Sequence, residues 1–231
     1  MARSLQNYPE LTAGFSSAAD GTMALQGGFT NRQYYLQQHD IDPRHAVHAG
    51  LCHGAQTAIV TAANGGSIIS ETDGLITTET DLGLAMTAAD CLLLSVYDPT
   101  EKVIGLVHAG SKGLAQEVLT RFLDTWKKYF PLNPADLMID ISPSICPEHY
   151  TVTSEQAKNF TKWLDACQKR GALVHLDLRK IARQQLVDGG VTPGNISVSP
   201  QCTFEDNNLF SYRRDHPTEP QLQIGYLMRR G

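Results

Sequence analysis

The stretch LGLAMTAADCLLLSVYDPTEKVIGLVHAG, residues 82–110, contains the longest apolar run of the chain. Residues Leu82 to Asp98 are apolar almost throughout, which is typical of one buried strand, or of two strands with a break near Ala88-Ala89-Asp90. The segment Asp98-Pro99-Thr100-Glu101 has the composition of a turn, and Val103–Val107 is the next apolar segment. The sequence therefore predicts a β-hairpin that is preceded by a break of small and polar residues.

The rest of the chain predicts helices and strands around this hairpin. Apolar residues at helical spacing predict helices, and short apolar runs between turn residues predict strands. The expected helices are Thr30–Gln38, Leu114–Tyr129, Ser154–Lys169 and Leu178–Val187, and the expected strands are Gln56–Ala62, Leu137–Ile141, Ile196–Val198 and Leu222–Met228. The alternation is too irregular for a doubly wound parallel sheet. We therefore expect an α/β fold of the α+β type, with mixed β-sheets flanked by helices in a single domain over residues 1–231.

Composition excludes several classes of protein. The 231 residues carry a formal net charge of −5 and are 42% hydrophobic, which excludes disordered and fibrous proteins. The mild acidity argues against binding of nucleic acid. No apolar run reaches the roughly 18 residues that span a membrane, and the first segment, MARSLQNYPEL, lacks the apolar stretch of a signal peptide. Five cysteines without a CxxC pair are typical of reduced thiols in the cytoplasm.

The break and the end of the hairpin carry the densest set of reactive side chains. Asp90 is costly to bury in an apolar run unless it is paired, and Cys91 follows it directly. His108 lies at the end of the second strand, so Cys91 and His108 are candidates for a Cys–His nucleophilic pair. The same side chains suit zinc or copper. A buried cysteine that serves only as a small apolar side chain is the third interpretation.

Three further groups of residues are candidates for binding a ligand. His45, His48 and His53 are close in sequence but lack the spacing of a zinc finger or of HExxH, and surface histidines are the alternative. Gly110-Ser111-Lys112-Gly113 leads from a strand into a helix, where backbone N–H groups and Lys112 favour an anion. Near the C-terminus, Arg213 and Arg214 beside an aromatic residue are candidates for recognising a phosphate or a base. A plain turn is the alternative interpretation of each of these two segments.

Several motifs occur together in a fixed order. The main ones are Ala89-Asp90-Cys91, His108-Ala109-Gly110 and Phe210-Ser211-Tyr212-Arg213-Arg214-Asp215, and the others are Gly14-Phe15-Ser16, Asn31-Arg32, Cys52-His53-Gly54, Asp73-Gly74-Leu75-Ile76-Thr77 and Pro143-Ser144-Ile145. In this order they resemble the motifs of the YfiH family, also described as multicopper polyphenol oxidase (laccase) or purine nucleoside phosphorylase. The resemblance covers most of the chain.

The resemblance implies a metal site and an activity. The metal ligands of the family correspond to His53, Cys91 and His108, with His48 as the rival of His53 because it also lies in a His-Ala-Gly context. Such a His2Cys set implies a catalytic zinc with a fourth position for water or substrate. The family is linked to phosphorolysis and deamination of adenosine and related purine nucleosides. For this chain it implies catalytic roles at Cys91, His108 and Asp90, and a small-molecule substrate.

The chain also departs from the family pattern. Where the family usually has HAGWRG, this chain has Ser111 in place of Trp and Lys112 in place of Arg, and Ser142 replaces the usual glycine before the proline of GPxI. A forked donor thus becomes a point charge beside the expected metal site. For the phosphate, Lys112, Arg213 and Arg214 remain candidates on physical grounds alone. Three other functions stay open: a copper-dependent polyphenol oxidase, a metal-free hydrolase or amidase that uses Cys91 with His108, and a protein that binds a nucleoside or a partner without turnover.

Overall fold

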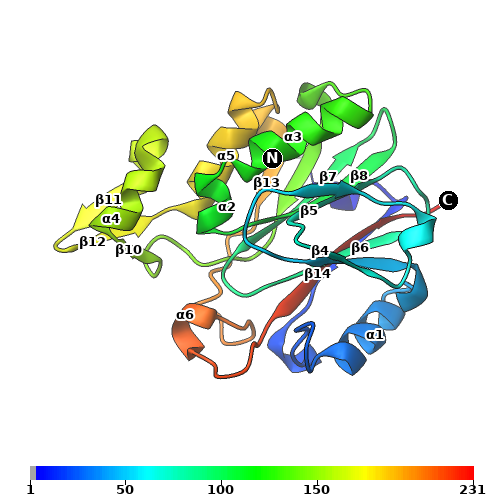
Figure 1. The fold of residues 1–231 in the computed structure, drawn as a ribbon, viewed down its shortest axis with the longest axis horizontal. Coiled ribbons are helices and arrows are strands. Elements are labelled where there is room, and N and C mark those ends of the chain that lie inside the picture. Colours follow the sequence, from blue (N-terminus) through cyan, green and yellow to red (C-terminus); the bar gives the residue numbers. More distant parts are fainter. Residues whose placement is uncertain (1–3) are drawn as a thin grey trace.

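Two mixed β-sheets packed face to face form the centre of the molecule, which a computed structural model describes over residues 4–231 (Figure 1). Residues 1–3, the start of the MARSLQNYPEL segment, lie outside the described residues. The five-stranded sheet has the order β1 (Leu11–Phe15), β14 (Gln223–Arg229), β6 (Gly83–Ala88), β2 (Ala46–Gly50) and β4 (Ile68–Ser70). The six-stranded sheet has the order β13 (Ile196–Val198), β9 (Met138–Ile141), β7 (Leu92–Asp98), β8 (Val103–Ala109), β5 (Gly74–Thr77) and β3 (Thr57–Ile59).

Both large sheets contain parallel and antiparallel pairs, so the predicted α+β fold with mixed sheets is confirmed. Strands β2, β4 and β6 pair in parallel, whereas β1, β14 and β6 pair antiparallel. A third, three-stranded antiparallel sheet has the order β10 (Thr151–Thr153), β12 (Leu173–Leu176) and β11 (Cys167–Arg170). In Figure 1 this small sheet and α4 project to one side of the molecule.

The predicted hairpin and its preceding break are both present. Strands β7 and β8 pair antiparallel from Leu92 opposite Ala109 to Asp98 opposite Val103. Asp90 has a φ of 76°, in the left-handed region, at the point where the chain leaves β6 for β7. The break is sharper than expected, because β6 and β7 belong to different sheets. Residues 89–91 therefore carry the chain from one layer of the sandwich to the other.

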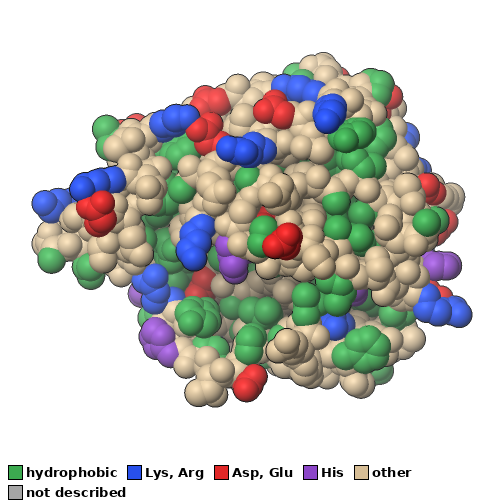
Figure 2. All heavy atoms as spheres, viewed as in Figure 1, with side chains coloured by type: hydrophobic (Ala, Val, Ile, Leu, Met, Phe, Trp, Pro, Cys, Tyr) green, Lys and Arg blue, Asp and Glu red, His purple; other side chains and the backbone are tan. Residues whose placement is uncertain are grey.

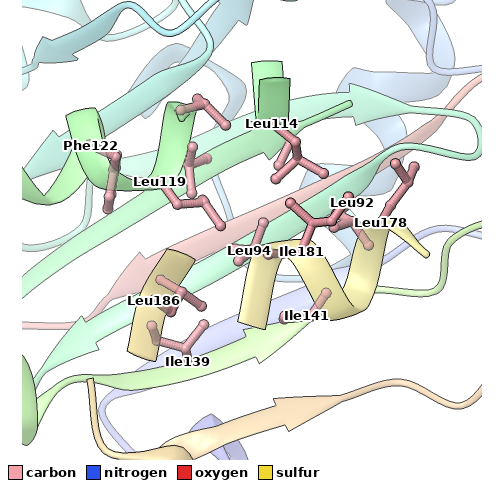
Figure 3. Close-up of a cluster of buried hydrophobic side chains, with 14 of the residues drawn as sticks. Leu92, Leu94, Leu114, Leu119, Phe122, Ile139, Ile141, Leu178, Ile181 and Leu186 are labelled. Carbon is pink, nitrogen blue, oxygen red and sulfur yellow. The ribbon is translucent and has the colours of Figure 1, made fainter. Parts of the chain in front are cut away.

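Helices cover the outer faces of the two sheets. The helices are α1 (Phe29–Gln38), α2 (Ser111–Ala115), α3 (Val118–Tyr129), α4 (Ser154–Ala157), α5 (Leu178–Asp188) and α6 (Tyr212–Asp215). Figure 3 shows how Leu119 and Phe122 on α3 and Ile181 on α5 meet Leu92, Leu94 and Ile139 of the six-stranded sheet. On the opposite side, Leu36 of α1 packs with Ala85 and Ile224 of the five-stranded sheet. The strands are thus buried on both faces, which explains their nearly continuous apolar runs.

Two of the predicted helices differ from the structure. The expected helix Leu114–Tyr129 is divided into α2 and α3 at Glu117, whose φ of 60° is left-handed. The expected helix Ser154–Lys169 is wrong beyond α4, because a 3₁₀ segment follows over Lys158–Ala166 and strand β11 begins at Cys167. In that segment Phe160 and Trp163 are buried, three residues apart, while Leu164 is 68% exposed. Phe160 and Trp163 have non-helical backbone angles that interrupt this segment, so burial of the two aromatic side chains outweighs the expected continuous α-helix.

Gly105 in β8 lies where the sheet meets α3, and we expect its substitution to destabilise the protein. A Cβ atom added at Gly105 would lie 2.6 Å from Phe122 Cζ and 2.8 Å from Trp126 Cζ3. Overpacking of this kind costs about 1–3 kcal/mol, so Gly105→Ala should lower the midpoint of urea unfolding accordingly. Gly194→Ala is the control, because its added Cβ meets nothing within 4 Å. Equal midpoints for the two variants would contradict this description of the packing.

The surface shows no large field of one charge on the face drawn in Figure 2, where Lys and Arg side chains are interspersed with Asp and Glu. Among residues 4–231, no helix combines the length and the apolar character that crossing a bilayer requires.

Candidate metal centre

Strand alternation places two of the predicted ligands between the two central sheets. In β8, Val103 and Val107 face the helices, whereas Ile104 and Leu106 face the five-stranded sheet. Because side chains alternate along a strand, His108 falls on the same side as Leu106. Cys91 likewise packs against the cluster between the sheets. Both side chains therefore extend this apolar layer at its end, where β7 begins and β8 finishes.

His53 completes the cluster from the loop that precedes β3. His53 has a left-handed φ of 56°, and its side chain is exposed, whereas His108 is buried. One potential ligand atom from each of His53, Cys91 and His108 lies within 4.8 Å of the other two. The two imidazole rings are 5.0 Å apart between centroids, at an interplanar angle of 71°. The structure thus brings together the three residues that the sequence indicated, one buried and one open to solvent.

Gly110 supplies the space in which this cluster lies. A Cβ atom at Gly110 would lie 2.8 Å from Cys91 Sγ, 3.5 Å from His108 Cε1 and 3.6 Å from His53 Nδ1. A methyl group at this position would therefore overlap the Cys91 sulfur and come into ordinary contact with both histidines. The donor set, one sulfur and two imidazoles, is suited to zinc, and a fourth position remains for a substrate or water. The residues present therefore fit a zinc-type ion.

Asp73, which directly precedes β5, contacts His108 and the loop that carries His53. Its Oδ1 lies 3.0 Å from His108 Nδ1 and accepts a hydrogen bond from the His53 backbone N–H at 3.0 Å. Its Oδ2 accepts from the Gly54 N–H at 2.8 Å and from the Cys52 thiol at 2.9 Å. With Nδ1 directed at the carboxylate, His108 is left with Nε2 as its free ring nitrogen. Asp73 therefore orients one ligand and fixes the loop that carries another.

The pKa values of the cluster reflect the same contacts. Burial opposes ionisation of the Cys91 thiol, but the charge of His108 and hydrogen bonds from both histidines lower its pKa to about 6. Burial also disfavours the charged form of His108, yet the Cys91 sulfur and the Asp73 carboxylate raise the pKa of His108 to about 9. Burial acts against ionisation of Asp73 as well, and its hydrogen bonds from His108, Cys52 and Gly54 nevertheless hold its pKa well below the ordinary value. The pocket thus favours a thiolate at Cys91.

Asp90, which directly precedes Cys91, has both carboxylate oxygens hydrogen-bonded. Its Oδ1 accepts from the Thr203 hydroxyl at 2.6 Å, and its Oδ2 accepts from the Arg213 backbone N–H at 2.7 Å. The buried carboxylate thus has the partners that an acidic group in an apolar run requires. It joins the start of β7 to two segments near the C-terminus. We therefore treat Asp90 as a residue that positions Cys91.

The three candidate phosphate ligands, Lys112, Arg213 and Arg214, differ in how many of their hydrogen-bond donors other protein groups occupy. The Arg214 guanidinium donates to the carbonyls of Thr203, Phe204, Asp206 and Leu209 and to both oxygens of Asp215. These acceptors occupy its donors, so we leave Arg214 out of the substrate site. The Arg213 guanidinium donates to the Thr151 carbonyl at 3.1 Å and lies 4.8 Å from the centroid of the Tyr150 ring. Lys112 is exposed in the first turn of α2.

Ser111, which replaces the tryptophan of the family pattern, takes part in the wall of the site. The Tyr150 hydroxyl donates to Ser111 Oγ at 2.7 Å. Tyr150 therefore links Ser111 on α2 to Arg213 on α6. Sequence reasoning did not single out Tyr150 or the role of Asp73 as the partner of His108. Asp73 lay within a quoted motif, but its contact with His108 depends on the pairing of β5 with β8, which the sequence did not predict.

The rival ligand His48 lies elsewhere. On β2, Val47 and Ala49 face the layer between the sheets, so His48 faces the other side, toward α1. Burial lowers the pKa of His48 to about 4, and the charge of Arg32 on α1 acts in the same direction. His48 Nδ1 is buried without a hydrogen-bond partner within the described residues. His45 is exposed, at the end of a short 3₁₀ turn, Pro43–His45.

Because His48 is half-buried and its pKa is lowered to about 4, we expect it to weaken the protein in acid. Its pKa is about 4 in the folded protein against an ordinary 6.5, so the unfolded chain binds the proton first. Stability should fall as the pH drops from about 6.5 to about 4, by up to about 3 kcal/mol. His48→Gln should remove this part of the slope when urea unfolding is measured at several pH values, whereas His45→Gln should keep it. Parallel curves for wild type and His48→Gln would contradict the expectation.

Comparisons with known proteins agree with the fold. The family model described as multi-copper polyphenol oxidoreductase laccase matches residues 4–225. The purine nucleoside phosphorylase YlmD of Bacillus subtilis (strain 168) is 31% identical, over 93% of this chain and 87% of the relative. A purine nucleoside phosphorylase of Streptomyces griseus, ORF3, is 28% identical, over 91% of this chain and 89% of its own. The solved structure of the hypothetical protein YfiH of Bacillus licheniformis has a TM-score of 0.91 and 26% identity, and covers 98% of this chain and 96% of that one.

Proposed function

The chain belongs to the multi-copper polyphenol oxidoreductase laccase family, also called the YfiH family, and from this membership we propose that it is a zinc-dependent enzyme that acts on purine nucleosides. The observation that carries the proposal is the cluster of His53, Cys91 and His108, whose potential ligand atoms lie within 4.8 Å of one another. Two relatives of similar length are named purine nucleoside phosphorylases. Adenosine is the substrate we infer, with phosphorolysis as the main reaction and deamination as the second.

Each residue of the site has a role in this proposal. His53, Cys91 and His108 would hold the zinc, which supplies a Lewis acid that polarises a substrate oxygen or activates a water molecule. Asp73 fixes the tautomer and the orientation of His108 through the contact at 3.0 Å. Gly110 leaves room beside Cys91 Sγ for a ligand. Lys112 and Arg213 are the proposed phosphate ligands, because an ammonium and a guanidinium both bind phosphate oxygens.

The chemical step requires a phosphate and a purine nucleoside in one site. Phosphate attacks the anomeric carbon of the ribose while the bond from that carbon to the purine nitrogen breaks. The products are the free base, which takes a proton, and ribose 1-phosphate. The aromatic ring of Tyr150 is suited to contact with a purine base. The Arg213 guanidinium, 4.8 Å from the centroid of that ring, is suited to binding the phosphate beside the base.

A product assay tests the proposal. Purified protein with measured zinc content is incubated with adenosine, with and without inorganic phosphate, and adenine, inosine and hypoxanthine are quantified. Adenine that forms only when phosphate is present supports phosphorolysis, and inosine that forms without phosphate supports deamination. If zinc-loaded protein yields no product above that of Cys91→Ser, the assignment of the substrate is wrong. Cys167→Ser is the matched control, because this cysteine lies on β11 outside the cluster.

A metal-free hydrolase remains the second candidate, since Cys91 and His108 lie together whether or not an ion is bound. Iodoacetamide labelling discriminates between the two. Zinc should protect Cys91 from alkylation and increase activity if the proposal is right, whereas activity that survives a chelator would favour the Cys–His pair. Copper-dependent oxidation of polyphenols has less support. Among residues 4–231 the second group of potential ligands contains one histidine, and copper clusters of an oxidase need several.

A further inference from the structure

A second set of potential metal ligands is built from two similar segments of sequence. In each segment a second potential ligand follows a cysteine by three residues. The segments are Cys146-Pro147-Glu148-His149, with a histidine, and Cys202-Thr203-Phe204-Glu205, with a glutamate. Each segment forms a tight turn, since the His149 N–H donates to the Cys146 carbonyl at 3.1 Å and the Glu205 N–H donates to the Cys202 carbonyl at 3.2 Å. Such turns bring the first and fourth residues close together. The two turns therefore each present a pair of ligands.

The two turns also pack against one another. The Thr203 N–H donates to the Ser144 carbonyl at 3.1 Å, just before the first turn. Cys146 Sγ lies 2.9 Å from Cys202 Sγ and 3.7 Å from Glu205 Oε1. His149 Nε2 lies 3.0 Å from Glu205 Oε1. Potential ligand atoms of Cys146, His149 and Glu205 all lie within 4.8 Å of one another.

We propose that these two turns bind a second divalent ion of the zinc class through Cys146, His149 and Glu205, with Cys202, whose sulfur lies 2.9 Å from Cys146 Sγ, moving in as the fourth ligand. Two sulfurs, one imidazole and one carboxylate are all ligands that zinc accepts, and four protein ligands are typical of a structural site. Two thiolates balance the charge of such an ion, and the carboxylate adds one further negative charge. The site is separate from the proposed catalytic zinc and does not depend on the proposed activity.

Burial and neighbouring contacts are consistent with this assignment. Both cysteines are buried, whereas Glu205 is exposed, so an ion can enter from solvent and reach the sulfurs. The Cys146 backbone N–H donates to Cys202 Sγ at 3.1 Å, a contact that holds this sulfur beside the first turn. The His149 ring stacks on Phe204, with centroids 4.2 Å apart and an interplanar angle of 12°, which fixes the orientation of the imidazole.

The place of this site in the fold indicates what the ion would do. The Ile145 N–H donates to the Asp90 carbonyl at 3.0 Å, and the Thr203 hydroxyl donates to the Asp90 carboxylate at 2.6 Å. The Tyr150 N–H donates to the Cys146 carbonyl at 3.1 Å. Both turns are thus joined to Asp90, which directly precedes Cys91, and the first turn is also joined to Tyr150. An ion that joins the turns would stabilise this wall of the site.

Cobalt binding tests the proposal in a background that lacks the first site. Metal-free Cys91→Ser protein is kept reduced and is titrated with Co²⁺, and the sulfur-to-cobalt charge-transfer absorption is followed. We expect one Co²⁺ per chain with a thiolate band. Cys91→Ser combined with Cys146→Ser or with His149→Ala should lose this stoichiometric binding, and combination with Glu205→Gln should weaken it at least tenfold. Combination with Cys167→Ser, which changes a cysteine that belongs to neither cluster, should leave it unchanged.

Thermal unfolding provides the second measurement, in case a cysteine variant fails to fold. Zinc should raise the unfolding midpoint of Cys91→Ser, and Glu205→Gln, a mild change at an exposed side chain, should reduce that increase. The proposal is overturned if reduced Cys91→Ser binds no stoichiometric Co²⁺, or if the second-site variants bind it equally well. It is also overturned if a disulfide between Cys146 and Cys202 is found and its reduction yields no metal binding. Each of these outcomes is independent of whether the wild-type protein cleaves adenosine.

Discussion

Cys91→Ser should abolish both zinc binding at the catalytic cluster and cleavage of adenosine. The thiolate is the anionic ligand of the proposed set, and the contacts of Cys91 with His53 and His108 lower its pKa to about 6. A serine hydroxyl stays protonated near neutral pH and is a poor ligand for zinc. Substitution of a residue that only hydrogen-bonds to a metal ligand lowers metal affinity or activity about 10- to 100-fold. Loss of a ligand itself should therefore reduce kcat/KM by more than about 100-fold.

The controls for Cys91→Ser separate loss of the metal from loss of the fold. Cys167→Ser removes another partly buried thiol and should keep full activity, since Cys167 is outside both groups of potential ligands. The free energy of unfolding of Cys91→Ser, measured in urea, should stay within about 1 kcal/mol of that of the metal-free wild type, because the change is nearly isosteric. Zinc retained at wild-type affinity, with full activity, would show that Cys91 is not a ligand.

Asp73→Asn should weaken zinc binding and activity, although Asp73 is not itself a proposed zinc ligand. One amide oxygen can replace one carboxylate oxygen, but the amide nitrogen then faces donors, either His53 N–H and His108 or Gly54 N–H and Cys52. The loss of orientation at His108 or at the His53 loop should cost about 10- to 100-fold in zinc affinity. A buried donor left without an acceptor should also cost about 1–3 kcal/mol of stability.

Asp98→Asn is the matched control for this prediction. Asp98 is buried and its Oδ1 accepts from the Thr100 and Glu101 N–H groups at the opposite end of β7. Its substitution should affect stability but leave zinc affinity unchanged. Zinc affinity is best measured by competition with a chromophoric chelator. If Asp73→Asn and Asp98→Asn reduce zinc affinity to the same extent, the effect is one of general stability and not of ligand orientation.

The central sheets could be predicted from the sequence because their strands are buried on both faces. Residues 82–110 contain continuous apolar runs, and the turn at Asp98-Pro99 divides them correctly into β7 and β8. Short strands such as β2 and β4 were not predicted, because their pairing depends on distant segments. The helix predicted for Ser154–Lys169 was wrong, since an apolar spacing of three and four residues does not reveal which side chains the rest of the fold buries.

The sequence predicted the residues of the cluster but not the contacts that hold their side chains in place. The family motifs indicated His53, Cys91 and His108, and the structure brings them together. The pairing of β5 with β8, which sets Asp73 against His108, requires the register of two strands that are 26 residues or more apart. The second cluster was not identified, because the spacing of Cys146 from His149 and of Cys202 from Glu205 becomes informative only when the two turns are seen side by side.

The most direct test is a crystal structure of zinc-loaded protein, with anomalous diffraction recorded on both sides of the zinc absorption edge. The proposal predicts one zinc peak among His53, Cys91 and His108, at about 2.3 Å from the sulfur and about 2.0–2.1 Å from one nitrogen of each imidazole. An absence of zinc at this cluster in crystals grown with excess zinc would contradict the proposal. So would an ion that only one of the three residues contacts.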